Sequence, residues 1–220
     1  MSTLTIDVIS DIVCPWCFIG ARRLDQALAS LPQPIEATVV YRPFLLDPST
    51  PPEGEDLRKR IGRKYGMDPE RMFGRVEEAA RESGIPLDFA KVHRSVSTVR
   101  AHVLLRHALE KGTQRALSGA LFEAYFLEGR DVGRVDVLAA IGAQHGFAVD
   151  EVEALLGDPD ELALTRDEAG AAAAQGVQGV PYFVFRRRFA LSGAQTPEVF
   201  RAAIARALAP ETARSSALEG

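Results

Sequence analysis

The first forty residues alternate between strand and helix patterns. Leu4 to Ile9 alternates its side chains with period two, which predicts a strand. From Pro15 to Leu31 apolar residues recur at helical spacing, which predicts an amphipathic helix. Two prolines end that helix, and Ile35 to Tyr41 is rich in β-branched residues, as in a second strand. This β-α-β order is the beginning of an α/β unit.

The pattern changes at a loop dense in chain breakers, from Arg42 to Gly54. From about Leu57 to Ala174 the periodicity is helical, and we predict no strand there. The predicted helices cover residues 57–65, 69–83, 98–111, 114–127, 135–145, 150–156 and 161–175. After Gly176, two short strands (182–185 and 189–192) and a helix (197–208) restore the α/β pattern.

The two ends of the chain therefore complement one another. We predict an α/β fold in which residues 1–50 and 176–210 form one discontinuous domain. Residues 51–175 form a helical insertion in this prediction. Residues 211–220 are mostly small and polar, and we expect a disordered tail.

Composition excludes several classes of function. The chain has 220 residues, of which 46% are hydrophobic and 25% charged, and this is ordinary globular composition. Its net charge of -4 gives no basic excess for nucleic acid or an anionic membrane surface. The sequence shows neither a signal peptide nor an apolar run of about 20 residues, so we expect a cytoplasmic protein with no membrane association. The sequence does not indicate the oligomeric state.

The chain has two cysteines, in the motif Cys14-Pro15-Trp16-Cys17. A cross-link across so short a loop would stabilise the fold little, so we interpret the pair as reactive. Cys14 comes at the beginning of the predicted helix, where unpaired N–H groups and the helix dipole favour a thiolate, and Pro15 suits the first turn. We predict that Cys14 forms a mixed disulfide and that Cys17 resolves it, with Trp16 influencing the exchange.

Two other interpretations of the cysteine pair stay open. A structural zinc site needs four ligands, and only His93, His102, His107 and His145 could complete one with the cysteines. The pair could also be inert core residues of a partner-binding module. We predict no metal.

Val180-Pro181 directly precedes a predicted strand. Proline is the residue for which a cis peptide bond costs little, so Pro181 is a candidate cis proline that exposes backbone to a substrate. The alternative is a trans proline that begins the strand.

Several other polar and aromatic residues are weaker candidates. Asp7 and Asp11 could transfer protons to or from Cys17, or could be a solvated residue and a turn residue. His102, Phe44 and Tyr182 are candidates for a substrate groove, although histidines and aromatic residues at helical spacing more often pack in a core. The basic run 186–188 is interpreted as a solvated hairpin turn or a recognition patch.

Five segments together resemble the DsbA family, in its FrnE-type branch. They are Asp7–Gly20, Arg42–Pro48, Ser97–His102, Gly179–Phe185 and Leu191–Gln195. The resemblance implies a thioredoxin-like fold with a large all-helical insertion, a cis proline at Pro181 beside the cysteines, and protein thiol–disulfide exchange. The acid that this family often carries before the cysteines matches Asp7 only if one extra residue is allowed.

The same family includes 2-hydroxychromene-2-carboxylate isomerases and kappa-class glutathione transferases, in which a serine commonly stands where Cys14 stands here. A glutathione-dependent isomerase or transferase is therefore the alternative function. Because this chain keeps both cysteines, we favour an oxidoreductase that exchanges electrons with protein or small-molecule thiols. We expect no tightly bound cofactor and name glutathione as a candidate redox partner.

Overall fold

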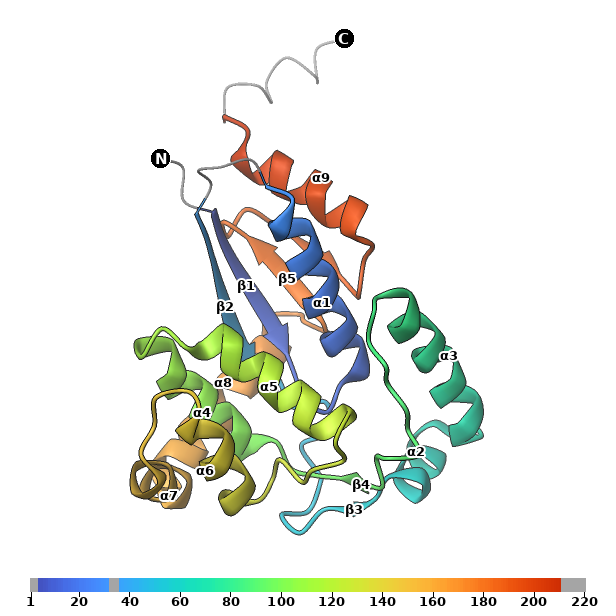
Figure 1. Cartoon of the computed structure of the whole chain (residues 1–220), viewed down its shortest axis with the longest axis vertical. Helices are drawn as coiled ribbons and strands as arrows, with labels where there is room; N and C mark the ends of the chain where they lie inside the picture. Colours follow the sequence, from blue (N-terminus) through green and yellow to red (C-terminus); the bar gives the residue numbers. More distant parts are fainter. Residues whose placement is uncertain (1–3, 32–35, 211–220) are drawn as a thin grey trace.

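Both ends of the chain contribute strands to one sheet. The computed structural model describes residues 4–31 and 36–210 (Figure 1). The strands β1 (Leu4–Ser10), β2 (Ala37–Pro43), β5 (Tyr182–Phe185) and β6 (Phe189–Ser192) lie in the order β2-β1-β5-β6. The β1–β2 pair is parallel, and β5 and β6 join in antiparallel register. The strands from the β-α-β beginning and from the β-β-α end of the sequence thus form one sheet.

Two helices cover one face of this sheet, α1 (Pro15–Ala29) and α9 (Pro197–Leu208). Alternate residues of β1 are buried, among them Leu4 and Ile6, which are 0% exposed. Phe183 of β5 packs edge to face on Phe200 of α9, with ring centroids 4.7 Å apart. Gly20 allows α1 to approach β5 closely, because a Cβ there would lie 3.0 Å from the Phe183 ring. Burial of these apolar side chains is the main stabilisation of this layer.

The remaining helices gather about the end of the sheet where β1 and β2 finish (Figure 1). They are α2 (Leu57–Tyr65), α3 (Pro69–Glu82), α4 (Val99–Glu110), α5 (Gln114–Phe126), α6 (Val135–Ala143), α7 (Val149–Gly157) and α8 (Pro159–Ala174). Phe18 of α1 stacks on Phe122 and Phe126 of α5, with centroids 5.3 and 5.9 Å away, so a single hydrophobic core joins α1 to the helical region.

A side chain forms hydrogen bonds with one residue at the free edge of β2. Gln114, at the beginning of α5, accepts a hydrogen bond from the backbone N–H of Tyr41 (2.9 Å) and donates one to its carbonyl (3.0 Å). An edge strand offers such unpaired backbone groups to any neighbouring chain. The Gln114 amide occupies one residue of that edge and fixes α5 to the sheet.

Most predicted elements are present with small shifts of their ends. The helix α2, the strands β5 and β6 and the helix α9 have the predicted bounds, whereas α1 ends at Ala29 rather than Leu31 and β1 extends to Ser10. The second strand is shifted, since β2 begins at Ala37 and ends at Pro43, and Pro32–Ile35 lie outside the described residues. The predicted tail, 211–220, lies outside them as well. The division into two domains stays a prediction.

The prediction of no strand within the helical region is wrong. Strand β4 (Arg94–Ser95) pairs antiparallel with β3 (Glu55–Asp56) just before α2. Two residues are too few to show a period of two, so no sequence pattern could indicate this ladder. None of the described helices combines the length and apolar character that crossing a bilayer requires.

The basic run 186–188 forms the tight turn between β5 and β6. The Arg188 N–H donates to the Phe185 carbonyl at 2.9 Å, and the two central residues of this turn, Arg186 and Arg187, both have positive φ, 49° and 55°. The guanidinium groups of Arg186 and Arg188 donate to the carbonyl of Ala207 at the end of α9, at 3.1 and 3.4 Å. Two of the three arginines therefore bind a helix C-terminus, where cations are favourable.

Candidate active site

Cys14 stands at the junction between β1 and α1. It is the N-cap residue of α1, with extended backbone (φ -91°, ψ 112°), and Pro15 is the first helical residue. The Cys14 side chain makes no capping hydrogen bond, and the Cys14 carbonyl accepts the first bonds of the helix from the N–H groups of Cys17 and Phe18, at 3.0 and 3.3 Å. The sulfur therefore lies at the positive end of the helix dipole, a position that favours an anion.

Cys17 lies one turn further into the helix and is 1% exposed. Burial, the nearby Cys14 thiol and its charge together raise the pKa of the Cys17 thiol well above its ordinary value. The nearby Ser10 hydroxyl and the Asp11 backbone act in the opposite direction and lower the pKa, by less. The two sulfurs therefore have different surroundings, and both are free thiols in this structure.

The peptide bond between Val180 and Pro181 is cis. The Cys14 thiol points to the carbonyl of Val180, with a sulfur–oxygen distance of 3.7 Å. Pro181 also packs on α1, since a Cβ on Gly20 would lie 3.1 Å from its ring. Residues 166 positions apart in the sequence thus meet at one sulfur, and the backbone before the cis proline flanks the cysteine motif.

Asp11 and His102 form a buried polar pair beside the cysteine motif. Asp11 is 1% exposed and His102 is 3% exposed, and the His102 Nε2 to Asp11 Oδ1 distance is 3.3 Å. The other carboxylate oxygen of Asp11 accepts from the Leu46 N–H at 2.7 Å. The backbone carbonyl of Asp11 accepts from the Cys14 N–H at 3.1 Å. The pair therefore ties α4 to the turn that carries Cys14.

Asp7 lies on the other face of the sheet. Its side chain pairs with Arg42 at 2.9 Å, next to α8 rather than α1. Residues on opposite faces of a strand point in opposite directions, so the structure does not bring Asp7 to the cysteines. Of the two predicted acids, only Asp11 adjoins the motif.

A family profile described as "DSBA-like thioredoxin domain" matches residues 5–205. The chain belongs to this family. Among solved structures, it is 33% identical to a probable DsbA oxidoreductase from Streptomyces coelicolor, with a TM-score of 0.84 over 93% of this chain and 89% of that chain. The predicted family and the predicted α/β thioredoxin-like fold with a helical insertion are confirmed.

Two more distant structures share the fold alone. A 2-hydroxychromene-2-carboxylate isomerase is 17% identical, with a TM-score of 0.71 over 98% of this chain and 99% of that chain. The cytosolic disulfide reductase DsbM from Pseudomonas aeruginosa, solved with GSH, is 20% identical, with a TM-score of 0.64 over 93% of this chain and 98% of that chain.

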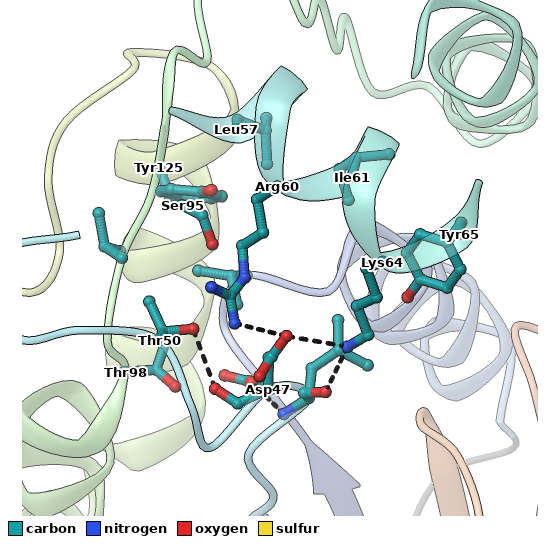
Figure 2. A pocket seen from close by; sticks show the side chains of 14 residues that line it. Asp47, Thr50, Leu57, Arg60, Ile61, Lys64, Tyr65, Ser95, Thr98 and Tyr125 are labelled. Atoms are coloured by element: carbon teal, nitrogen blue, oxygen red, sulfur yellow. Dashed lines mark hydrogen bonds and ion pairs between the residues drawn. The ribbon is translucent and has the colours of Figure 1, made fainter. Parts of the chain in front are cut away.

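In this DSBA-like domain, a small cavity of about 50 Å³ lies beside the cysteine motif (Figure 2). Its wall includes Asp11 and Val13 before Cys14, and the α2 residues Arg60 and Lys64. Figure 2 shows the guanidinium of Arg60 reaching down from α2 toward Asp47 on the facing loop. Apolar side chains line much of the cavity, but Arg60 and Lys64 place charged groups of α2 next to the turn that carries the thiol.

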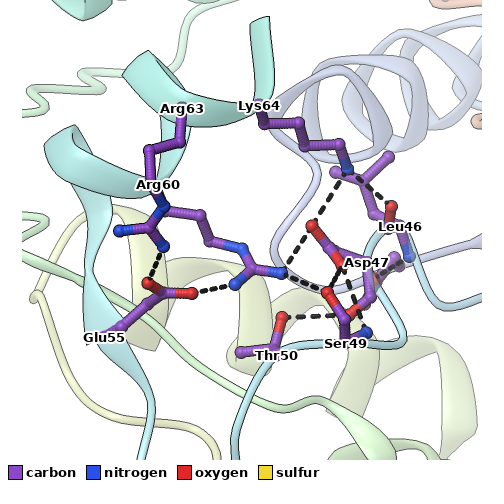
Figure 3. Close-up of polar contacts among 9 residues, drawn as sticks. Leu46, Asp47, Ser49, Thr50, Glu55, Arg60, Arg63 and Lys64 are labelled. Atoms are coloured by element: carbon purple, nitrogen blue, oxygen red, sulfur yellow. Dashed lines mark hydrogen bonds and ion pairs between the residues drawn. The ribbon is translucent and has the colours of Figure 1, made fainter.

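Ion pairs hold the loop after β2 against α2 (Figure 3). Asp47 pairs with Arg60 at 2.5 Å and with Lys64 at 3.2 Å, while Glu55 pairs with Arg60 and Arg63. Burial opposes ionisation of Asp47, but hydrogen bonds from Ser49, Lys64 and Arg60 outweigh it and lower its pKa to about 2. The loop that supplies the Leu46 N–H to Asp11 is thereby fixed by charge.

Replacing Asp47 by asparagine is expected to destabilise the protein by about 1 kcal/mol at pH 7, allowing for solvent screening. Because the pKa of Asp47 is lower in the folded chain, its stabilisation is complete above about pH 4 and is lost as the pH falls through about 2. Urea unfolding of both proteins between pH 7 and pH 2.5, within the range that remains folded, measures this difference. The control variant is Asp136→Asn, in the exposed ion pair with Arg134, and we expect little change in its stability. A difference independent of pH would contradict the assignment.

The three residues predicted to line a substrate groove lie in different parts of the structure. Phe44 lines a hollow of about 190 Å³ with Leu45, Pro48 and small residues of α8. Tyr182 is half-buried in β5, whereas His102 is buried against Asp11 and is not the surface residue that a groove requires. Trp16, at 39% exposed, is the large apolar residue that the motif presents to solvent.

Sequence reasoning missed three buried polar residues: Ser10 at the end of β1, Arg60 in the wall of the small cavity, and Gln114 at the edge of β2. Each acquires its role from a partner distant in the sequence or from its strand face, and a single polar residue carries no periodic signal. For the zinc alternative, residues 4–31 and 36–210 hold no group of three or more His, Cys, Asp or Glu side chains that could bind a metal.

Proposed function

We propose that this protein is a thiol–disulfide oxidoreductase whose working groups are Cys14 and Cys17. The observation that carries the proposal is the placement of the Cys14 sulfur, at the N-cap of α1 and 3.7 Å from the carbonyl before a cis proline. A thiolate there attacks a substrate disulfide, and the backbone at Val180 lies where an extended substrate segment can pair with it. Both cysteines are buried, but Cys14 is the N-cap residue beside the Val180 carbonyl, whereas Cys17 lies one turn inside α1. This difference in position supports the division into attacking and resolving cysteines.

The substrate in this proposal is a protein or small-molecule disulfide, with glutathione as a redox partner. The disulfide reductase DsbM, which shares the fold, was solved with GSH and is described as cytosolic. That likeness supports glutathione as the electron donor and a cytoplasmic location, both of which stay proposals.

The experiment that tests the proposal traps the intermediate. In Cys17→Ser protein, Cys14 still attacks, but no second thiol releases the product, so a stable mixed disulfide is expected. Incubation with oxidised glutathione or a disulfide-bonded peptide, followed by intact mass measurement, should show one adduct per chain. Cys14→Ser is the matched control and should show none. Absence of the adduct in the Cys17→Ser protein would refute the proposal.

A further inference from the structure

Ser10 carries a buried hydroxyl that the fold alone does not explain. It is the last residue of β1 and is 3% exposed. Its Oγ makes no hydrogen bond to any protein atom, sulfur included, among the described residues. A buried polar group without a partner destabilises a fold, so a serine at this position calls for an explanation.

The sulfur of Cys17 supplies one. Ser10 is on the same strand face as Ile6 and Val8, because side chains alternate along a strand. Val8 lies opposite Phe183, whose ring packs against Gly20 of α1, so this is the face that α1 covers. Cys17 is buried in that helix, and the Ser10 hydroxyl and the Asp11 backbone are the hydrogen-bonding groups that favour its ionised form. In the thiol form the sulfur is a weak acceptor, which accounts for a hydroxyl without a standard hydrogen bond.

The resolving step generates negative charge at this sulfur. Cys17 attacks the Cys14 sulfur of the mixed disulfide, the Cys14–substrate S–S bond breaks, and the Cys14–Cys17 S–S bond forms. The protein pair is oxidised by two electrons, and the substrate leaves as a thiol that gains the one proton Cys17 loses. In the reverse direction Cys17 is the leaving thiolate. Both directions pass through a charged sulfur in a site that excludes water.

We propose that Ser10 is a catalytic residue of the resolving step, whose hydroxyl donates a hydrogen bond to the sulfur of Cys17 while that sulfur carries negative charge. This role rests on the proposed function. Hydrogen bonds to charged groups are stronger than neutral ones, and stabilisation aimed at charge that develops during the reaction accelerates it.

The aromatic disulfide dithiobis-nitrobenzoate separates the two steps. Attack by Cys14 releases a first coloured nitrothiobenzoate, and attack by Cys17 on the mixed disulfide releases a second. In Ser10→Ala the first phase should keep the wild-type rate and the second should slow about tenfold. The rate of the second phase against pH should also shift to higher pH, because the Cys17 thiolate has lost a donor.

The control is Ser118→Ala, in α5. The Ser118 hydroxyl is likewise buried and unpaired among the described residues, but it lies beside Tyr41 and is not among the groups that influence the Cys17 thiol. Both phases should be unchanged in this variant. Ser10→Thr retains the hydroxyl and should recover most of the second-phase rate, with urea unfolding used to check that each variant is folded.

The outcomes separate the two proposals. Equal second-phase rates and pH profiles in Ser10→Ala and wild type would overturn the role of Ser10, as would an equal slowing of both phases. No first phase in the wild type would instead overturn the attack by Cys14, and with it the proposed function.

Discussion

Replacing Cys14 by serine should lower disulfide reductase activity by about a thousandfold or more. A serine hydroxyl at the same position meets the same helix N-terminus, but it ionises far less readily than a thiol and forms no disulfide. The measurement is the rate of insulin reduction with reduced glutathione or dithiothreitol as electron donor. The volume change is small, so the unfolding midpoint should stay near that of the wild type.

The comparison with Cys17→Ser distinguishes a nucleophile from a structural cysteine. That variant should also lose most of its insulin reductase activity, and without an added thiol it should consume one equivalent of disulfide and stop. Unchanged insulin reduction by the Cys14→Ser protein would contradict the mechanism. Turnover of a chromene or an aryl halide with glutathione, surviving loss of Cys17, would instead favour the isomerase or transferase alternative.

Local patterns predicted the parts of the site that are close in sequence. The cysteine motif opening a helix follows from Pro15 and from the periodicity after it, and α1 begins at Pro15. The proline before β5 was a candidate for a cis bond because of its residue type, and that bond is cis. Each of these features is encoded within a few residues, where propensity and spacing carry the information.

The polar contacts around the site could not be predicted in the same way. In the sequence, Gln114 is an ordinary polar residue at the beginning of a predicted helix. Its hydrogen bonds to Tyr41 depend on where α5 meets the edge of the sheet. Asp7 and Asp11 were equivalent candidates in the sequence. The structure distinguishes them: Asp7 lies on the face of the sheet that α8 covers, whereas Asp11 lies in the turn between β1 and Cys14.

His102 shows how the helical region supports the active-site turn. The sequence suggests His102 as a residue of a substrate groove. In the structure it is buried and contacts Asp11, 91 positions earlier in the chain. The Asp11 side chain binds the loop after β2 through Leu46, and its carbonyl binds the N–H of Cys14. A polar pair at the centre of these contacts fixes the turn only while both members are present.

His102→Leu is expected to destabilise the protein by about 3 kcal/mol, because the Asp11 carboxylate stays buried after its partner is removed. Urea unfolding at neutral pH measures this change. The matched control is His107→Leu on the same helix, whose partner Glu161 is 3.0 Å away with side chains 29% and 23% exposed. Removing this more solvated pair should cost about 1 kcal/mol or less.

The double variant Asp11→Leu/His102→Leu tests the cause. Because it removes the buried carboxylate together with its partner, it should recover part of the stability lost in His102→Leu. If the loss came only from an altered packing volume on α4, the double variant would be at least as unstable as the single one. Equal destabilisation by His102→Leu and His107→Leu would likewise contradict a buried pair, since Glu161 is more exposed than Asp11 and still pairs with Arg106 at 2.8 Å when His107 is removed.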